Sequence, residues 1–422
     1  MDKKITVVGL GYIGLPTAAV LAKKGLNVLG YDINKRVVES LNKGEIIIEE
    51  PGLKELVKEV VRDGYLRGIN SFEKSDVFII AVPTPIKEDK TADISYVETA
   101  VEAIVPFLEK GNIVVLESTS PPGTTEDIIA PILEKSGLVI GEELFIAHSP
   151  ERVLPGKIIQ ELVENDRIIG GINEKSTQLV KEVYEVFVEG EIFTTDSKTA
   201  EMTKLMENTY RDVNIALANE LAIISENMGI NAWEVIKLAN KHPRVNLHQP
   251  GPGVGGHCIA VDPWFVIEGQ PEAKLIRQAR EINDNTPGRV MKKIESLMKT
   301  QDGKLTILGV TYKPDVDDTR ESPIIKLIDK LKGNTKFELA IHDPHAKRDI
   351  FKYKDILVDN IEEAVKNSEL IVLGVNHLMY KNLDFKKIGG LMKNKQIYDT
   401  RNFLDEKDLL DNGFQVNIIG RD

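Results

Sequence analysis

The sequence predicts an α/β protein with two doubly wound domains, joined by a central helical segment with one long helix. Three observations lead to this prediction. Short β-branched apolar runs alternate with helix-like segments near the start of the chain, the same order returns near its end, and one long helical pattern lies between the two halves. At 422 residues, the chain is also too long for a single hydrophobic core.

The N-terminal half begins with the pattern of a parallel sheet. A glycine-rich turn follows the first apolar run, a helix is predicted over residues 15–24, and the second run ends at Asp32. A strand, a glycine turn, a helix, a second strand and then an acid are the order in which a Rossmann-like dinucleotide-binding sheet begins. The strands predicted here cover residues 4–8, 27–31, 77–82 and 113–116.

The C-terminal half repeats this order of strands. Three or four recurring strands predict a second Rossmann-like domain. Its first turn lacks a complete Gly-x-Gly-x-x-Gly pattern, so we expect it to hold a different ligand. The corresponding apolar runs lie at residues 304–310, 339–343, 367–375 and 396–400.

A single long helix is predicted over residues 197–227. Asp196 or Ser197 can cap its start, and Gly229 follows its end. Its apolar positions form a stripe too broad for one docking face, so the helix is covered either by a second subunit or by the two domains of its own chain. These positions are Met202, Leu205, Met206, Val213, Leu217, Leu221 and Ile224. We place the domains at residues 1–195, 196–295 and 296–422.

The composition of the chain argues against several kinds of binding partner and site. The net charge of −12, without a basic stripe on any predicted helix, argues against nucleic acid as a partner. No apolar run approaches the roughly 20 residues of a membrane helix. Cys258 is the only cysteine, so it has no internal disulfide partner and no companions for a cysteine-rich metal site. The first predicted strand also leaves no room for a signal peptide, and we expect a cytoplasmic protein without a metal.

The first glycine turn predicts a cofactor. Gly9 permits the tight turn, Gly11 lets the backbone approach a pyrophosphate, and Gly14 allows the helix to pack closely. Asp32 stands where a carboxylate accepts hydrogen bonds from a ribose, and it would repel a 2′-phosphate. The cofactor is therefore expected to be NAD rather than NADP.

Cys258 is the candidate nucleophile. A lone cysteine is more often a buried small hydrophobe, but a Pro- and Gly-rich run comes directly before this one, as expected where a ligand approaches the backbone. His257 is adjacent, and Asp262 lies four residues on, where it can position a water molecule. An active thiol in a chain with an NAD fingerprint suits the complete oxidation of an alcohol to a carboxylate, because the thiol can retain the aldehyde.

Two further groups of polar residues are candidates for the site. Lys204, Asn208 and Arg211 project from one face of the long helix, which is either an exposed polar face or a wall that holds a developing oxyanion. Cations in predicted loops are individually most often solvated, although several together would suit a phosphate-bearing substrate. They are Arg152, Arg244, Lys313, Arg320 and Arg401.

The motifs together resemble those of the UDP-glucose/UDP-mannuronic acid dehydrogenase family. The resemblance runs over the whole chain: GLGYIGLPTAAVLA begins at Gly9, STSPPGT at Ser118, SPERVLPG at Ser149, EMTKLMENTYRDVNIALANELA at Glu201, GPGVGGHCIAVDPWF at Gly251 and GVTYKPDVDDTRESP at Gly309. The blocks at Glu151, His242 and His257 are most similar to members that act on UDP-N-acetyl-D-mannosamine. UDP-glucose dehydrogenases carry a second Glu four residues beyond the one matched by Glu151, and Pro155 stands there instead.

The resemblance implies a role for each matched residue. Cys258 would trap the C6 aldehyde as a thiohemiacetal, which a second oxidation by NAD turns into a thioester. Lys204 and Asn208 would stabilise the oxygen anion, and Asp262 and Glu151 would serve the hydrolytic water. Residues near the cofactor would be Tyr12, Ile13, Arg36, Thr84, Thr119 and Arg320. Residues holding the nucleotide sugar would be Arg152, Val153, Lys204, Asn208, Arg211, His242, Arg244, Gly255, Tyr312, Lys313 and Arg401.

The resemblance also implies a homodimer or homotetramer, with Arg244 reaching into the neighbouring subunit, and a uronic acid product for polysaccharide biosynthesis. Three alternatives stay open. The first is a sibling enzyme acting on UDP-N-acetylglucosamine or UDP-glucose. The second is a non-catalytic sensor of NAD or a nucleotide sugar, which would need neither Cys258 nor Lys204. The third is a simple two-electron dehydrogenase, which would not need the second α/β domain.

Overall fold

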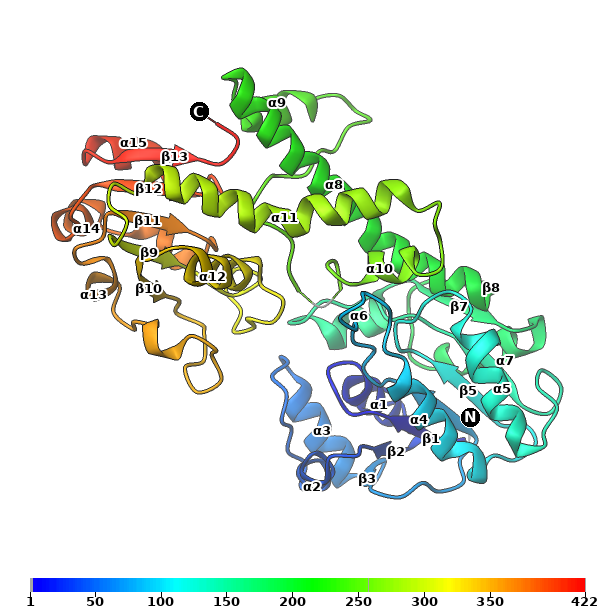
Figure 1. The fold of residues 1–422 in the computed structure, drawn as a ribbon. Helices are drawn as coiled ribbons and strands as arrows, with labels where there is room; N and C mark the ends of the chain where they lie inside the picture. Colours follow the sequence, from blue (N-terminus) through cyan, green and yellow to red (C-terminus); the bar gives the residue numbers. More distant parts are fainter. Residues whose placement is uncertain (1–2, 257, 422) are drawn as a thin grey trace. The chain divides into compact units, whose positions relative to one another are not determined.

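A computed structural model of the protein describes residues 3–256 and 258–421. The chain divides into two compact units (Figure 1). Unit 1 comprises Met1–Glu207 and Trp264–Gln270, and unit 2 comprises Asn208–Pro263 and Pro271–Asp422.

The sheet of unit 1 has eight strands in the order β3-β2-β1-β4-β5-β6-β7-β8. The first six follow the doubly wound order of a dinucleotide-binding fold, which confirms the predicted fold class. The pair β6·β7 is antiparallel and every other neighbouring pair is parallel. The strands are β1 (Lys4–Val8), β2 (Asn27–Tyr31), β3 (Leu66–Ile69), β4 (Val77–Ile80), β5 (Ile113–Leu116), β6 (Phe145–His148), β7 (Arg167–Gly171) and β8 (Ile192–Asp196).

Helices cover both faces of this sheet. Along β4, Val77 and Ile79 belong to one apolar cluster, whereas Phe78 and Ile80 belong to another, because successive side chains of a strand point to opposite faces. The first cluster includes α1, α3, α6 and α7, and the second includes α4 and α5. These helices are α1 (Gly14–Lys23), α2 (Lys35–Asn42), α3 (Leu53–Arg62), α4 (Ser95–Ile104), α5 (Ala130–Leu133), α6 (Ile158–Glu164) and α7 (Glu174–Tyr184), with short helical turns at Val105–Phe107, Thr124–Ile129 and Glu134–Ser136.

Unit 2 contains the second parallel sheet, in the order β10-β9-β11-β12-β13. Leu370 and Val372 of β11 face one apolar cluster, and Ile371 and Leu373 face another. The strands are β9 (Lys304–Leu308), β10 (Glu338–His342), β11 (Leu370–Leu373), β12 (Gln396–Asp399) and β13 (Gln415–Ile418). The helices are α9 (Ala232–Ala239), α11 (Lys274–Leu297), α12 (Pro323–Asn334), α13 (Ile361–Val365), α14 (Phe385–Leu391) and α15 (Glu406–Asp411), with short turns at Lys354–Ile356 and Leu378–Asn382.

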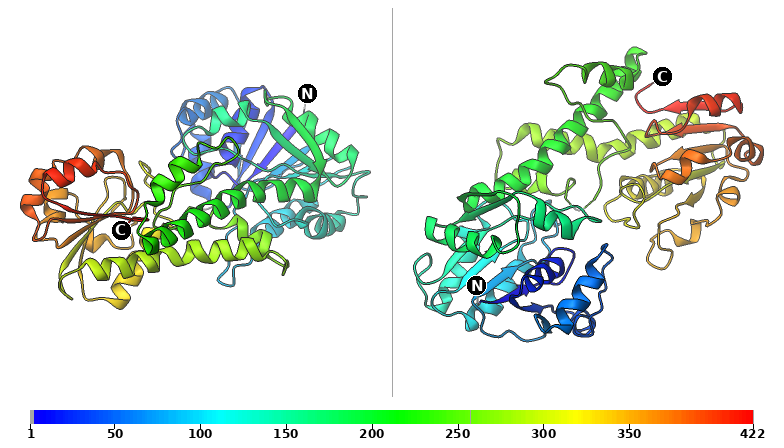
Figure 2. Two further views of the ribbon diagram at one scale, coloured as in Figure 1. Left: turned by 90° about the horizontal axis from the view of Figure 1, so that it is seen from above. Right: turned by 180° about the vertical axis from the view of Figure 1, so that it is seen from behind.

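The long helix α8 spans Ser197–Met228, which confirms the predicted helix to within one residue. Both α8 and the short α10 (Asp262–Ile267) contain residues of each unit. In unit 2, α11 runs beside the C-terminal part of α8 (Figure 2), where Arg289 pairs with Glu226. Leu217 and Ile224 of α8 are 48% and 47% exposed, so these two apolar side chains do not lie in the interior of the chain. Among the described residues, no helix has the length and apolar character to cross a membrane.

Candidate active site

The turn between β1 and α1 in unit 1 has space for a ligand against its backbone. Gly9 has a φ of 94°, and a β-carbon there would lie 2.6 Å from the carbonyl oxygen of Ala81. A β-carbon at Gly14 would lie 1.8 Å from the carbonyl oxygen of Gly9, so both positions require glycine. Gly11 has no neighbouring atom within 4 Å of that position. The turn therefore fits the pyrophosphate of a dinucleotide, as its glycines predict.

Three other residues expected near the cofactor, Asp32, Thr84 and Thr119, each follow a parallel strand of this sheet. Asp32 follows β2, and its carboxylate accepts hydrogen bonds from the backbone N–H groups of Leu10 at 2.9 Å and Asn34 at 2.8 Å. The hydroxyl of Thr84, after β4, donates to the carbonyl of Thr119, after β5, at 2.6 Å. The structure thus gathers these residues at the carboxyl edge of the sheet, where doubly wound folds bind ligands. Tyr12 and Arg36 are exposed, and Ile13 is half-buried.

Glu151 lies in a cluster of buried polar side chains in unit 1, and its partner there was not predicted from the sequence. One oxygen of Glu151 pairs with the guanidinium of Arg167, and the other accepts the N–H of Arg152 at 2.7 Å. Arg167 also donates to the hydroxyl of Ser149 at 3.1 Å and to the carboxyl of Glu117 at 3.3 Å. Arg167 follows Glu151 by 16 residues, a spacing with no local signal, so only the folded chain reveals the pair.

The second carboxyl of this cluster titrates near neutral pH. Burial is the main cause that raises the pKa of Glu117 to about 7, and the nearby charge of Glu151 adds to it, while Arg167 acts in the opposite direction. The hydroxyl of Tyr184 donates to Glu117 at 2.6 Å. Arg167 therefore holds Glu151 in a defined orientation, beside a second carboxyl whose pKa is raised by burial.

Other residues of unit 1 that flank the predicted site differ in their burial and in their partners. Arg152 is half-buried and its guanidinium contacts Glu207 at 2.8 Å. Val153 and Lys204 are half-buried in the same unit, and Pro155 is exposed. Glu201, one turn before Lys204 on α8, accepts hydrogen bonds from the N–H groups of Gly123 and Thr125. This contact joins the start of α8 to the loop after β5, which holds Thr119.

Cys258 lies in unit 2 and is an exposed residue. Its carbonyl accepts the N–H groups of Val261 at 3.0 Å and Asp262 at 2.8 Å, which forms a turn that leads into α10. The amide of Asn208 donates to the carboxylate of Asp262 at 2.6 Å, and these side chains are 7% and 3% exposed. The structure therefore joins two predicted site residues that are 54 positions apart. His257 lies outside the described residues.

The glycine-rich segment before Cys258 packs against the second sheet domain. A β-carbon at Gly256, whose φ is 86°, would lie 2.9 Å from the ring of Tyr312. One at Gly251 would lie 2.9 Å from the guanidinium of Arg401, and one at Gly255 would lie 2.6 Å from the carbonyl of Glu321. These glycines allow the cysteine segment to approach Tyr312 and Arg401, both of which were expected to hold the nucleotide sugar.

Arg401 has the properties of an anion-binding residue. Its Nε donates to the carbonyl of Gly374 at 3.1 Å. Burial lowers the pKa of Arg401 to about 10, and the nearby Asp399 only partly opposes this effect. The oxygens of Asp399 accept backbone N–H groups of Arg401, Phe403 and Leu404. A desolvated guanidinium of this kind gains free energy when a phosphate or carboxylate binds beside it.

The loop that carries Tyr312 and Lys313 is held by a buried histidine. Nδ1 of His377 accepts the backbone N–H of Asp315 at 2.9 Å, and its Nε2 lies 3.1 Å from the carboxylate of Asp343. Asp315, His345 and His377 bring three possible metal-ligand atoms within 4.8 Å of one another. Because both ring nitrogens of His377 are already engaged, we assign these residues to holding the loop.

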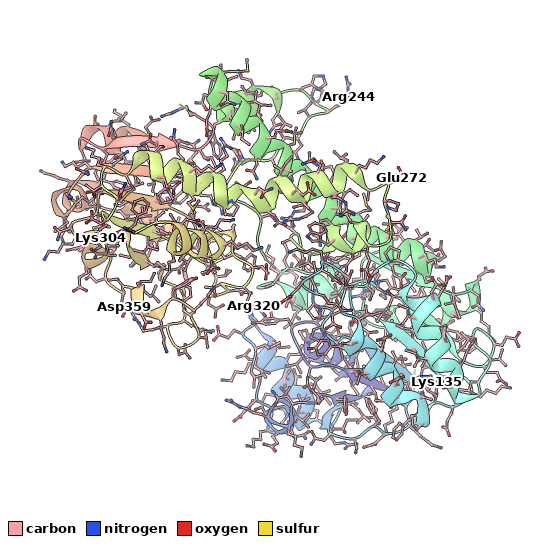
Figure 3. The ribbon with its side chains drawn as sticks, viewed as in Figure 1. Lys135, Arg244, Glu272, Lys304, Arg320 and Asp359 are labelled. Atoms are coloured by element: carbon pink, nitrogen blue, oxygen red, sulfur yellow. The ribbon has the colours of Figure 1, made fainter. Side chains whose placement is uncertain are left out.

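The remaining predicted residues lie on exposed parts of unit 2. Figure 3 shows Arg244 on the loop after α9 and Arg320 on the loop before α12. His242 and Arg244 are both exposed, and Arg211 and Lys313 are exposed as well. Arg320 donates to both oxygens of Asp318, at 2.9 and 2.8 Å.

Comparison with known proteins identifies the family. Residues 3–188 match the NAD binding domain of the UDP-glucose/GDP-mannose dehydrogenase family, residues 198–285 match its central domain, and residues 306–406 match its UDP binding domain. The chain belongs to this family. The family explains why one chain holds two Rossmann-like domains, because the first binds NAD and the second binds UDP. It also confirms the resemblance stated from the motifs and the expectation of an NAD-dependent dehydrogenase.

Individual members of the UDP-glucose/GDP-mannose dehydrogenase family match over the full length. A UDP-N-acetyl-D-mannosamine dehydrogenase of Methanocaldococcus jannaschii is 50% identical over 426 residues, covering 100% of this chain and 97% of that protein. An NDP-N-acetyl-D-galactosaminuronic acid dehydrogenase of Ralstonia solanacearum is 45% identical and covers 96% and 97%. The solved UDP-D-ManNAc dehydrogenase of Pyrococcus horikoshii superposes with a TM-score of 0.91, at 42% identity, over 99% of each chain.

Proposed function

We propose that this chain is a UDP-N-acetyl-D-mannosamine 6-dehydrogenase, which oxidises the C6 alcohol of the sugar to a carboxylate with two NAD+ for each sugar. The position of Cys258 carries the proposal. This exposed residue lies on a segment that packs against Tyr312 and Arg401, in a chain whose first domain matches an NAD binding domain. A lone thiol buried in an apolar interior would have argued against this reaction.

The thiol of Cys258 meets the central requirement of a four-electron oxidation, which is that the aldehyde must not escape. Its Sγ would form a bond to the aldehyde carbon C6, and the aldehyde oxygen would take a proton to give a thiohemiacetal. After the second oxidation, C6 is the carbonyl carbon of a thioester. Water then adds its oxygen to C6 and the C–S bond breaks, which returns the thiolate and releases the carboxylate. Bound NAD+ supplies the hydride acceptor, one molecule for each two-electron step.

The chain offers groups for each charge that develops. The ammonium of Lys204 and the amide of Asn208 would stabilise the oxyanion on C6. Asp262, whose carboxylate is held by Asn208, would orient the hydrolytic water. Glu151 would accept a proton from that water, and its pairing with Arg167 holds its carboxyl in a defined orientation for this role.

Each sheet domain would bind one of the two ligands. The turn at Gly9, Gly11 and Gly14 would hold the pyrophosphate of NAD, and Asp32 would accept hydrogen bonds from its ribose. Arg401 and Tyr312 would hold the nucleotide sugar beside the cysteine segment. We assign Tyr12, Ile13, Arg36, Thr84, Thr119 and Arg320 to the cofactor, and Arg152, Val153, Arg211, His242, Arg244, Gly255 and Lys313 to the nucleotide sugar.

The choice of sugar rests on two observations. Relatives named as UDP-N-acetyl-D-mannosamine dehydrogenases are 48–50% identical over nearly the whole chain. In addition, Pro155 replaces the second Glu that UDP-glucose dehydrogenases carry in this block, and the proline is exposed. Both observations favour the N-acetylmannosamine substrate over glucose.

The test is turnover of purified protein with NAD+ and one sugar at a time: UDP-N-acetylmannosamine, UDP-N-acetylglucosamine, UDP-N-acetylgalactosamine or UDP-glucose. We expect the highest kcat/KM with UDP-N-acetylmannosamine and two NADH for each sugar consumed. One NADH per sugar would contradict the double oxidation. Preference for another sugar would assign the chain to a sibling enzyme, and binding of all components without turnover would indicate a sensor.

We further propose that the protein is a cytoplasmic homodimer or homotetramer that supplies uronic acids to polysaccharide biosynthesis. A reducing compartment suits a thiol nucleophile. The subunit contact would use α8 and α9, where exposed apolar side chains include Leu217, Ile224, Met228 and Leu238. Sedimentation of the purified protein tests the assembly, and a monomer at micromolar concentration would exclude this use of the surface.

A further inference from the structure

The start of the cysteine segment is held by one buried side chain. The backbone N–H of Gly251 donates to Oδ1 of Asn219 at 2.9 Å. Asn219 is 1% exposed and belongs to α8, whereas Gly251 begins the glycine-rich run that ends at Cys258. Both residues lie in unit 2, so the contact is internal to that unit.

Asn219 is itself fixed by a chain of buried hydrogen bonds. Its Nδ2 donates to Oδ1 of Asn283 at 2.9 Å, and Nδ2 of Asn283 donates to Oδ1 of Asp212 at 2.8 Å. Arg280, which is completely buried, pairs with the same carboxylate. Both amides in this series of hydrogen bonds therefore donate toward the carboxylate of Asp212. This direction defines the orientation of the Asn219 amide and leaves its Oδ1 facing Gly251. Hydrogen bonds aligned in this way polarise and strengthen one another.

The far end of the segment is held by the same helix. Asn208 donates to Asp262, four residues after Cys258. Asn208 and Asn219 are 11 residues apart on α8, which corresponds to about three turns and about 16 Å, so the two amides lie on nearly the same face of the helix. The segment from Gly251 to Asp262 is thus attached to α8 at both ends, with Cys258 between them.

We propose that Asn219 is a positioning residue that holds the start of the Cys258 segment, and that Asn283, Asp212 and Arg280 act through it. The proposal rests on the proposed function, because it assumes that Cys258 is the nucleophile. Without the bond from Asn219, Gly251 can shift away from α8 while Asp262 stays attached. The thiol of Cys258 can then move relative to Arg401. A displacement of the reacting group near 1 Å is enough to lower the rate of the reaction about 100-fold.

The test uses Asn219→Ala, with Asn214→Ala as a matched control. Asn214 lies on the same helix, and its amide bonds to the carbonyl of Tyr210 at an exposed position. Because Cys258 is the only cysteine, its alkylation by iodoacetamide reports on one thiol in the full-length protein. For Asn219→Ala, we expect at least a threefold change in this alkylation rate and a 10- to 100-fold loss of kcat, both well below the unfolding temperature. Asn214→Ala should change neither quantity.

The conservative variant Asn219→Asp separates positioning from simple stability. A protonated carboxyl at this position can accept from Gly251 and donate to Asn283, whereas an ionised one cannot donate. Burial at this position favours the neutral form of the introduced carboxyl. We therefore expect near-normal alkylation of Cys258 at pH 6 and a growing departure from the unsubstituted protein as the pH rises. A role limited to stability would change the melting temperature without this pH-dependent difference in thiol reactivity.

The outcomes are distinguishable from failure of the proposed function. If Asn219→Ala is folded and keeps the unsubstituted alkylation rate and kcat, the proposal is wrong. If Asn219→Ala does not fold, a pH profile of Asn219→Asp that parallels the unsubstituted protein would overturn it. If no nucleotide sugar is oxidised by any form, the proposed function fails, but an altered alkylation rate would still support the positioning role of Asn219.

Discussion

The amide of Asn208 donates a hydrogen bond of 2.6 Å to the carboxylate of Asp262, and both side chains are buried. Asn208 is on α8 and Asp262 begins α10, four residues beyond Cys258. A buried carboxylate that loses such a donor is left poorly solvated, which makes the pair a direct target for substitution.

We expect Asn208→Ala to lower kcat about 10- to 100-fold, because a hydrogen bond to a charged group contributes about 1.5–3 kcal/mol and one factor of ten corresponds to about 1.4 kcal/mol. The measurement is steady-state NADH formation at saturating NAD+ and nucleotide sugar. Asn214→Ala on the same helix serves as the control. An unchanged kcat for Asn208→Ala would show that Asp262 does not depend on this partner during turnover.

The glycine turn predicts opposite results for two neighbouring substitutions. Gly11→Ala places its methyl group in open space, so the melting temperature should change little, while the KM for NAD+ rises at least tenfold because the methyl group meets the cofactor. Gly14→Ala would place its methyl group 1.8 Å from the carbonyl of Gly9 and should destabilise unit 1 by several kcal/mol. Thermal unfolding and NAD+ titration distinguish the two. Unweakened NAD+ binding by Gly11→Ala would place the cofactor elsewhere.

Glu117 should make stability depend on pH. Burial raises the pKa of Glu117 to about 7 from its ordinary value of 4.5. The folded protein therefore binds more protons than the unfolded chain between these values, and this group lowers the stability progressively as the pH rises from about 4.5 to 7. Glu117→Gln, which resembles the protonated form, should be more favourable relative to the unsubstituted protein at pH 8 than at pH 5. Melting temperatures at both pH values give the comparison, and a difference of the opposite sign would contradict it.

Arg401→Lys should separate binding of the two ligands. A lysine keeps the charge but cannot present the planar pair of donors to a phosphate or carboxylate. We expect the KM for the nucleotide sugar to rise about tenfold or more, with little change in the dissociation constant of NAD+ measured without sugar. A selective loss of NAD+ binding would instead move Arg401 out of the nucleotide-sugar site. The melting temperature provides the control for folding.

A final prediction concerns His377, which holds the loop that carries Tyr312. His377→Ala removes the acceptor of the Asp315 N–H and the partner of Asp343. We expect a loss of about 1–3 kcal/mol in the free energy of unfolding, because the buried carboxylate of Asp343 loses one of its hydrogen-bond partners and the Asp315 N–H loses its acceptor, and a higher KM for the nucleotide sugar. Denaturant unfolding and steady-state kinetics measure both effects. A lower stability with an unchanged KM would limit His377 to a structural role.

Local patterns in the sequence were sufficient for the elements that follow local rules. The strands at residues 4–8 and 27–31, the glycine turn between them and the long helix from residue 197 depend on side-chain period, caps and glycine positions, which neighbouring residues specify. The antiparallel pair β6·β7 and the edge strand β13 were not predicted, because their pairing depends on distant segments.

The same division applies to the candidate site. Cys258, Asn208, Asp262, Glu151 and Arg401 could each be named from the sequence and its resemblance to a family. Which residues pair with one another could not be predicted, and some of the partners were not named at all. Arg167 beside Glu151 and Asn219 beside Gly251 are separated along the chain by 16 and 32 residues. Burial of a charge or an amide requires a partner in space, and only the folded backbone determines which distant group supplies it.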